Sequence, residues 1–144
     1  MKSFNILWFE DNIQDFDEII PELEAHCSSH GMLFLHDHYK AYPTDFDVKL
    51  FEGKYSLCFI DLNLQKGQKG IEIIEILRKY GAFIDVLLYS NNPGELIKLT
   101  EGKNYVEGVF RHATLNGISG KMQDVIDQVI YKEMMALERH KETL

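Results

Sequence analysis

The sequence is short of cysteine, of basic residues and of long apolar runs, and each shortage excludes a class of protein. Its 144 residues include only Cys27 and Cys58, which both sit among apolar residues and are interpreted as reduced core thiols rather than a disulfide. Lysine and arginine total 15 against 23 acidic residues, and the net charge of −8 argues against a nucleic-acid-binding surface. No apolar run approaches the roughly 20 residues of a membrane-spanning helix.

The organisation of the chain indicates one domain. Lys2 is followed by the strand-like segment FNILWF rather than by a long apolar segment with a small-residue cleavage site, so no signal peptide and a cytoplasmic location are predicted. There is no internal repeat, low-complexity tract or linker. We therefore expect a single domain over residues 1–144, with its core at about 4–135.

Apolar and polar segments alternate in a way that predicts five strands, each followed by a helix. The predicted strands cover residues 4–9, 32–35, 57–60, 83–89 and 105–110. The predicted helices cover residues 13–27, 45–51, 71–80, a short segment from 93, and 119–139. Pro21 conflicts with the first helix, which either bends there or restarts with Pro21 in its first turn.

This alternation predicts the fold class. Strands that alternate with helices over short connections form a parallel sheet with right-handed crossovers and helices on both faces. We expect an α/β protein with a three-layer, flavodoxin-like (βα)5 sandwich and the strand order 2-1-3-4-5. In that order the first and third strands are neighbours at the point where ligands bind.

Two of the predicted strands run straight into acidic residues. The buried run over 57–60 ends at Asp61, and the first strand ends at Glu10 and Asp11. Neighbouring strands would bring these three carboxylates to one edge, where they repel one another unless a cation intervenes. Oxygen ligands of this kind suit Mg²⁺ (or Mn²⁺), and Asp61 is then the natural nucleophile toward a phosphoryl group.

These residues resemble the receiver domain of two-component response regulators over nearly the whole chain, about residues 4–135. Glu10 and Asp11 are similar to the acidic pair of the receiver pocket, and Asp61 is similar to the phosphoacceptor. The resemblance implies that the backbone carbonyl of Asn63 completes the metal site. It also implies that the hydroxyl of Ser90, at the end of the fourth strand, binds the phosphoryl group.

The resemblance further implies a signalling function. A histidine kinase or histidine phosphotransfer protein would donate a phosphoryl group to Asp61 with Mg²⁺ present. The surface formed by the helix from residue 93, the fifth strand and the last helix would then change its affinity for a downstream protein or output domain. Such a chain catalyses only its own phosphorylation and dephosphorylation and is not a metabolic enzyme. Membrane and nucleic-acid partners are not expected, and a homodimer is left open.

The sequence also departs from the receiver pattern. The family has Lys and then Pro after the fifth strand, and alignment places His112 and Ala113 at these positions. An imidazole does not supply the fixed positive charge of lysine. Arg111 is expected on the opposite face of the strand, and Val109 stands where the family has an aromatic residue. The loop 65–70, which ends in the expected glycine before the helix, is one residue longer than usual.

Three other functions are alternatives to a phosphoacceptor receiver. A pseudo-receiver would use the same fold as a phosphorylation-independent interaction module. A haloacid-dehalogenase-type hydrolase needs a second acid two residues after the nucleophile, where this chain has Asn63. A flavodoxin needs a phosphate-binding loop where this chain has Glu10 and Asp11. His36 and His38 share one face of a strand, but no third metal ligand is placed beside them.

Overall fold

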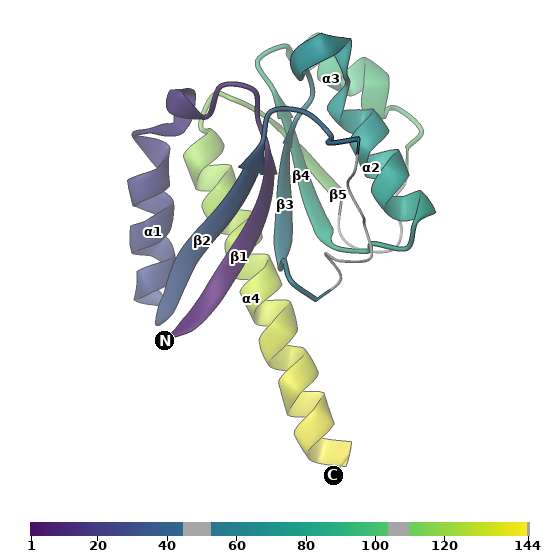
Figure 1. Cartoon of the computed structure of the whole chain (residues 1–144). Coiled ribbons are helices and arrows are strands. Elements are labelled where there is room, and N and C mark those ends of the chain that lie inside the picture. The colour runs from purple at the N-terminus through teal and green to yellow at the C-terminus, as the bar shows by residue number, and fades with distance from the viewer. Residues whose placement is uncertain (45–52, 104–109, 144) are drawn as a thin grey trace.

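The computed structural model describes residues 1–44, 53–103 and 110–143. Within them, five parallel strands form one sheet in the order β2-β1-β3-β4-β5 (Figure 1). The strands are β1 (Lys2–Phe9), β2 (Met32–Tyr39), β3 (Leu57–Asp61), β4 (Asp85–Ser90) and β5 (Phe110–Thr114). The predicted flavodoxin-like fold class and strand order are confirmed.

Four α-helices among the described residues cover the two faces of the sheet (Figure 1). They are α1 (Ile19–Ser29), α2 (Gly70–Lys79), α3 (Pro93–Thr100) and α4 (Ile118–Thr143). One core cluster joins α1 and α4 to the sheet through buried residues such as Leu23, Met122 and Trp8. A second cluster joins α2 and α3 to the opposite face, so the sheet is the middle of three layers.

The register of the central strands sets the position of the acidic residues. β1 pairs with β3 so that Phe9 lies opposite Ile60, and the next residues along the two strands are Glu10 and Asp61. The four residues before Asp61 in β3 are all buried, as expected for a strand covered on both faces. Both acids therefore emerge at the same edge of the sheet.

The segment after β1 resolves the conflict at Pro21. Residues Ile13–Phe16 form a short 3₁₀ helix, η1, and α1 begins separately at Ile19. Pro21 then stands in the first turn of α1, where its missing N–H has no intrahelical acceptor to lose. Of the two predicted solutions, the restarted helix is the one observed.

The fifth strand differs from its prediction. The predicted helix over 45–51 and the strand residues 105–109 lie outside the described residues. The described strand β5 starts at Phe110 and continues to Thr114, beyond Arg111 and His112 where the sequence predicted its end. β5 is an edge strand with partly polar residues. Its C-terminal part is a strand because it pairs in parallel with β4, although the sequence there has no apolar pattern that would predict a strand.

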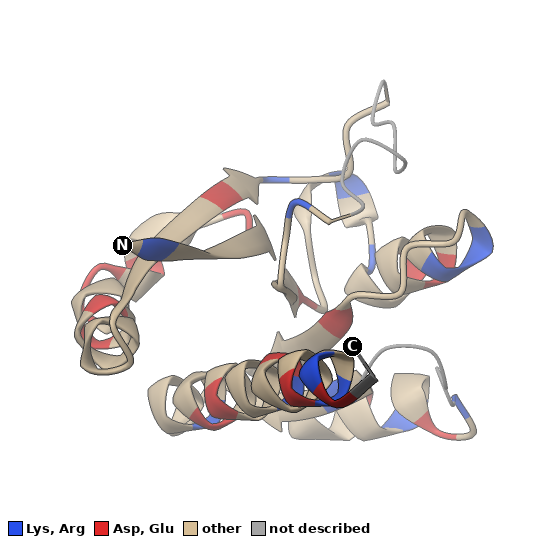
Figure 2. Ribbon diagram, turned by 90° about the horizontal axis from the view of Figure 1, so that it is seen from below, with Lys and Arg blue, Asp and Glu red and all other residues tan. Residues whose placement is uncertain are grey.

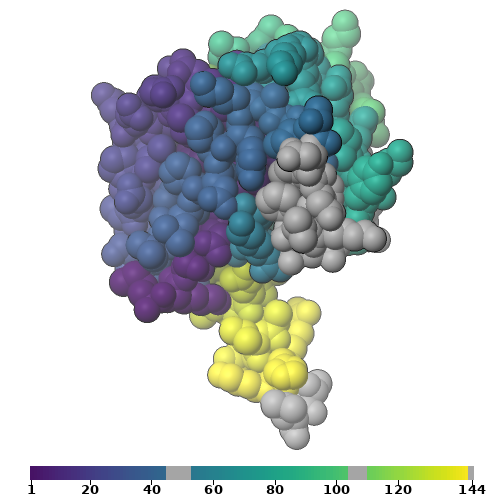
Figure 3. Space-filling model, viewed as in Figure 1, coloured from purple at the N-terminus to yellow at the C-terminus, as the bar shows by residue number. Residues whose placement is uncertain are grey.

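The C-terminal end of α4 extends beyond the rest of the molecule (Figure 3). Tyr131, Met134 and Leu137 are exposed on it, although Met122 and Val129 earlier in the same helix are buried. Even with 26 residues α4 is too polar to cross a membrane, and no other helix in the described part of the chain is long and apolar enough.

Gly70 lies against the backbone of the strand that carries Asp61. A Cβ atom on Gly70 would lie 2.4 Å from the carbonyl oxygen of Asp61 and 2.7 Å from Cγ2 of Ile60. The Gly70 N–H donates to the carbonyl of Leu62 at 2.7 Å, which holds the start of α2 against the end of β3. Only glycine fits here without moving the backbone that positions Asp61.

Gly70→Ala is therefore expected to lower the free energy of unfolding by about 1–3 kcal/mol, the usual cost of overpacking. Chemical denaturation measures the change. Gly120→Ala in α4 is the matched control, because nothing lies within 4 Å of its Cβ position. Alanine there should be neutral or stabilising by up to about 1 kcal/mol, since it favours a helix interior over glycine. Equal effects at the two positions would contradict the close approach at Gly70.

Candidate functional site

A pocket of about 450 Å³ opens at the carboxyl ends of the strands. Its walls come from the segments that follow β1, β3, β4 and β5 and from the first residues of α1 and α4. The lining residues are Glu10, Asp11, Asn12, Asp15, Phe16, Ile19, Asp61, Asn63, Asn91, Leu115 and Ile118. Ligand sites of open α/β sheets lie in this position, which makes the pocket the candidate site.

Three carboxylates meet in this pocket. One oxygen from each of Glu10, Asp11 and Asp61 lies within 4.8 Å of the other two. Glu10 is buried, with only 3% of its surface exposed, whereas Asp11 and Asp61 are partly exposed. No Lys or Arg is among the described residues that line the pocket. The convergence of the three acids expected from the sequence is confirmed.

Glu10 is held by a buried hydrogen-bond chain that starts at Trp8. The indole Nε1 of Trp8 donates to the hydroxyl of Tyr89 at 2.9 Å, and that hydroxyl donates to Oε1 of Glu10 at 2.7 Å. Oε2 of Glu10 accepts the backbone N–H of Asn12 at 3.0 Å. Trp8 and Tyr89 lie within two of the predicted strands, and the sequence does not single them out as part of the site. The residue types alone indicate that these side chains need hydrogen-bond partners, because a buried Trp or Tyr usually finds a partner for its polar atom.

Burial and neighbouring negative charges raise the pKa of Glu10 and of Asp61. Burial raises the pKa of Glu10 to about 7 and the charge of Asp61 adds to the rise, although the donors Asn12 and Tyr89 oppose it. The pKa of Asp61 is also raised, mainly by burial and further by the charges of Asp11 and Asp15. The pocket therefore contains more negative charge than its own donors neutralise.

The donor set fits a hard divalent cation. Carboxylate oxygens are the ligands that Mg²⁺ and Mn²⁺ prefer, and a cation would replace the proton that Glu10 retains. Glu10, Asp11 and Asp61 supply these oxygens, and Asn63 lines the same pocket. The role of the Asn63 backbone carbonyl as a further ligand stays a prediction.

The loop after β3 contains a cation that sequence analysis did not single out. The backbone N–H of Asn63 donates to Oδ1 of Asp61 at 3.1 Å and orients that carboxylate. Nζ of Lys69 donates to the side-chain oxygen of Asn63 and to Oε1 of Glu95, the latter at 2.8 Å. Lys69 thus connects the loop after β3 with the start of α3, beside the pocket.

Ser90 lies at the end of β4 but is not one of the pocket-lining residues. It is 1% exposed, and its hydroxyl oxygen accepts the backbone N–H of Asn92 at 3.0 Å. Side chains alternate along a strand, and the preceding residue, Tyr89, is the one that reaches Glu10. A contact between Ser90 and a phosphoryl group stays a prediction. It requires the Ser90 hydroxyl to rotate away from the N–H of Asn92 and toward the pocket.

The placement of His112 at the end of the fifth strand is corrected. In the register of β4 and β5, His112 lies opposite Leu88, and Thr114 lies opposite Ser90. His112 is exposed and does not line the pocket, whereas Leu115, just beyond the strand, does. Because the strand continues past His112, the residue level with Ser90 carries a hydroxyl and not an imidazole.

His36 and His38 lie on the edge strand β2, away from the acidic pocket. His36 packs against Trp8, with ring centroids 5.6 Å apart, and burial lowers the pKa of its imidazole. No third metal-ligating side chain joins them among the residues described. The described residues therefore give no support for a metal site at His36 and His38.

Solved structures similar to this chain include receiver domains. The receiver domain of a response regulator from Clostridium thermocellum matches with a TM-score of 0.59 at 15% identity, covering 92% of this chain and 98% of that one. A Francisella response regulator receiver domain matches with a TM-score of 0.57 at 15% identity, over 90% and 98% of the two chains. The anti-anti-sigma factor PhyR from Bartonella quintana matches with 0.59 at 18% identity, over 97% of this chain and 52% of PhyR.

The sequence itself matches no protein-family model and no curated protein. Identities of 15–18% establish a shared fold and not a shared activity. The strand order, the helix layers and the acidic pocket at the ends of β1 and β3 agree with that fold. The chain has the fold of response regulator receiver domains.

Proposed function

We propose that this chain is a phosphoacceptor receiver that takes a phosphoryl group onto Asp61 from a phosphohistidine donor. The observation that supports it is the meeting of Glu10, Asp11 and Asp61 within 4.8 Å in a receiver fold. The donor is a histidine kinase or a histidine phosphotransfer protein. The proposal treats residues 1–144 as one receiver domain that acts in the cytoplasm, without a metabolic activity of its own.

In the proposed reaction, a carboxylate oxygen of Asp61 attacks phosphorus in line with the departing imidazole. The P–N bond breaks, the imidazole nitrogen keeps its electron pair, and an acyl phosphate forms on Asp61. The Asn63 N–H, at 3.1 Å from Oδ1 of Asp61, holds the nucleophile in place. Glu10, Asp11 and Asp61 would hold a divalent ion, which would supply positive charge to offset the phosphoryl oxygens.

The signal would leave through the surface formed by α3, β5 and α4. Ser90 precedes α3, and in the proposal its hydroxyl leaves Asn92 to bind a phosphoryl oxygen. That exchange would move the start of α3, because the Asn92 side chain caps the helix by accepting from Glu95 N–H at 3.0 Å. Lys69, which donates to Glu95 in the first turn of α3, would then be affected by a movement of that turn. A downstream protein or output domain would read the change.

A phosphorylation-independent pseudo-receiver is the second candidate function. The fifth strand offers the hydroxyl of Thr114, and not a cation, level with Ser90. In addition, Glu10 already accepts two hydrogen bonds from the protein. PhyR, whose chain is about twice as long, is described as an anti-anti-sigma factor, and this supports a role in protein binding.

Incubation with acetyl phosphate and Mg²⁺, followed by intact-mass measurement, distinguishes these two functions. A phosphoacceptor gains the mass of one phosphoryl group, and Asp61→Asn abolishes the gain because the amide is not a nucleophile. Asp15→Asn is the matched control, since Asp15 is an exposed acid of the same pocket and should leave phosphorylation intact. If the folded protein gains no mass and its Asp61 resonances do not respond to beryllofluoride with Mg²⁺, the pseudo-receiver is the better description.

A further inference from the structure

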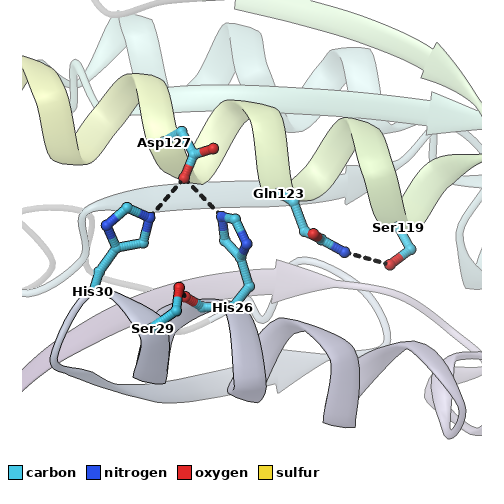
Figure 4. Close-up of polar contacts among 6 residues, drawn as sticks. All are labelled: His26, Ser29, His30, Ser119, Gln123 and Asp127. Atoms are coloured by element: carbon cyan, nitrogen blue, oxygen red, sulfur yellow. Dashed lines mark hydrogen bonds and ion pairs between the residues drawn. The ribbon is translucent and has the colours of Figure 1, made fainter.

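A second cluster of potential metal ligands lies between α1 and α4, apart from the acidic pocket (Figure 4). His26 belongs to α1, His30 follows its last residue, and Asp127 faces them from α4. Nε2 of His26 lies 2.6 Å from Oδ1 of Asp127, and Nε2 of His30 lies 3.0 Å from the same oxygen. Both imidazoles therefore point at one carboxylate oxygen.

The spacing of these atoms is close to that of a metal site. Two histidines four residues apart on a helix are a recurrent arrangement for binding zinc, and His26 and His30 have this spacing, with His30 as the residue that caps the C-terminal end of α1. The ligand atoms of His26, His30 and Asp127 all lie within 4.8 Å of one another. Ligands about 2.0–2.1 Å from a tetrahedral zinc ion are separated by about 3.3 Å. A small outward shift of the carboxylate would admit an ion.

The surroundings leave this cluster accessible to a solvent ion. The side chains are 20% exposed for His26, 38% for His30 and 46% for Asp127. Water can thus complete the coordination. The helix α1 carries acidic residues and no Lys or Arg, as the red segments in Figure 2 show, so no fixed positive charge of α1 opposes a cation.

Neighbouring polar groups are engaged elsewhere or buried. Gln123, one turn before Asp127 on α4, donates to the hydroxyl of Ser119 at 3.1 Å and points away from the imidazoles (Figure 4). The thiol of Cys27 is fully buried in the core cluster that joins α1 and α4 to the sheet, and it is not in the group of ligand atoms that lie within 4.8 Å of one another. Two imidazoles and one carboxylate therefore define the site.

We propose that His26, His30 and Asp127 bind a zinc-class divalent metal ion that cross-links α1 to α4. The nitrogen-rich ligand set favours Zn²⁺ and its first-row neighbours over Mg²⁺, whereas the acidic pocket has the opposite preference. The two sites therefore take different ions. Because the ligands come together only in the folded chain, binding stabilises the packing of α1 on α4.

The test uses the full chain with Glu10→Gln and Asp61→Asn, so that the acidic pocket does not compete for the ion. Calorimetric titration with Zn²⁺ is expected to show one ion per chain with a dissociation constant in the micromolar range or below. Co²⁺ in place of Zn²⁺ should give the visible absorption bands of a low-symmetry four-coordinate site. Binding should release protons and weaken as the pH is lowered, since imidazole must be neutral to ligate.

Matched variants in the same background assign the site. His30→Ala and Asp127→Asn are each expected to weaken Zn²⁺ binding by more than about 100-fold, because loss of an outer-shell partner alone costs about 10–100-fold. His112→Ala removes an exposed histidine outside the cluster and should leave the affinity unchanged. Circular dichroism checks that each variant is folded. An unchanged Zn²⁺ affinity in either His30→Ala or Asp127→Asn, or no binding at about 1 mM Zn²⁺, would overturn the proposal.

Discussion

Without a divalent ion, the titration of Glu10 is expected to lower the free energy of unfolding by about 3 kcal/mol as the pH rises from about 4.5 to about 8. The cause is Glu10, whose pKa is raised from 4.5 to about 7 in the folded protein, mainly by burial. Between these two values the folded chain binds a proton that the unfolded chain has lost. Each unit of pH in that range therefore favours unfolding by about 1.4 kcal/mol.

Mg²⁺ should reverse this loss, because the cation replaces the proton among the three carboxylates. At pH 8 an Mg²⁺ concentration of about 100 times its dissociation constant should restore about 2.7 kcal/mol, provided that only the folded state binds. At pH 5 the same concentration should have little effect, since the proton competes. Urea denaturation across the pH range, with and without Mg²⁺, measures both quantities.

Glu10→Gln is the control for this prediction, because glutamine keeps the shape of the side chain and does not titrate. Most of the pH dependence should disappear in this variant, and the response to Mg²⁺ should weaken. Asp61, whose pKa is also raised, would account for the slope that remains. A free energy of unfolding that stays constant or rises over this range in the metal-free protein would contradict the assigned protonation of Glu10.

The central part of the fold could be predicted because buried strands leave a plain signal. Uninterrupted apolar residues fill β1 from Ile6 to Phe9 and β3 from Leu57 to Ile60, since both faces of the sheet are covered there. Once these strands were neighbours in a parallel sheet, topology alone brought Glu10 and Asp61 to one edge. That placement needed only the order of the strands, and for this reason the acidic pocket could be predicted.

Other features depend on contacts that no local pattern encodes. The edge strand β5 is defined by its pairing with β4, and so the sequence did not reveal that the strand continues past His112 to Thr114. The hydrogen bond between Tyr89 and Glu10 joins residues 79 apart. His26 and His30 are four residues apart at the end of α1, but only the packing of α4 brings Asp127 to them. Register and helix packing are global properties of the chain.

Tyr89→Phe is expected to lower the free energy of unfolding by about 2–4 kcal/mol, although it removes a single oxygen atom. The hydroxyl both accepts from Trp8 and donates to Glu10, so its loss leaves two buried polar groups without that partner. Burial raises the pKa of the Tyr89 phenol well above its ordinary value, which keeps it a donor at every working pH. Tyr131→Phe, at an exposed site, should change stability by less than about 0.5 kcal/mol.

The same variant tests whether Tyr89 also tunes the acidic pocket. Its hydrogen bond lowers the pKa of Glu10, so its removal should raise that pKa further and leave Glu10 less ionised at pH 7. Mg²⁺ affinity should then fall at pH 7 and recover at higher pH, a change that a purely structural role would not produce. Trp8 is the only tryptophan, and its indole N–H resonance reports the broken contact directly. If the indole resonance shifts but the pH profile of Mg²⁺ binding does not change, Tyr89 has only a structural role and does not tune the acidic pocket.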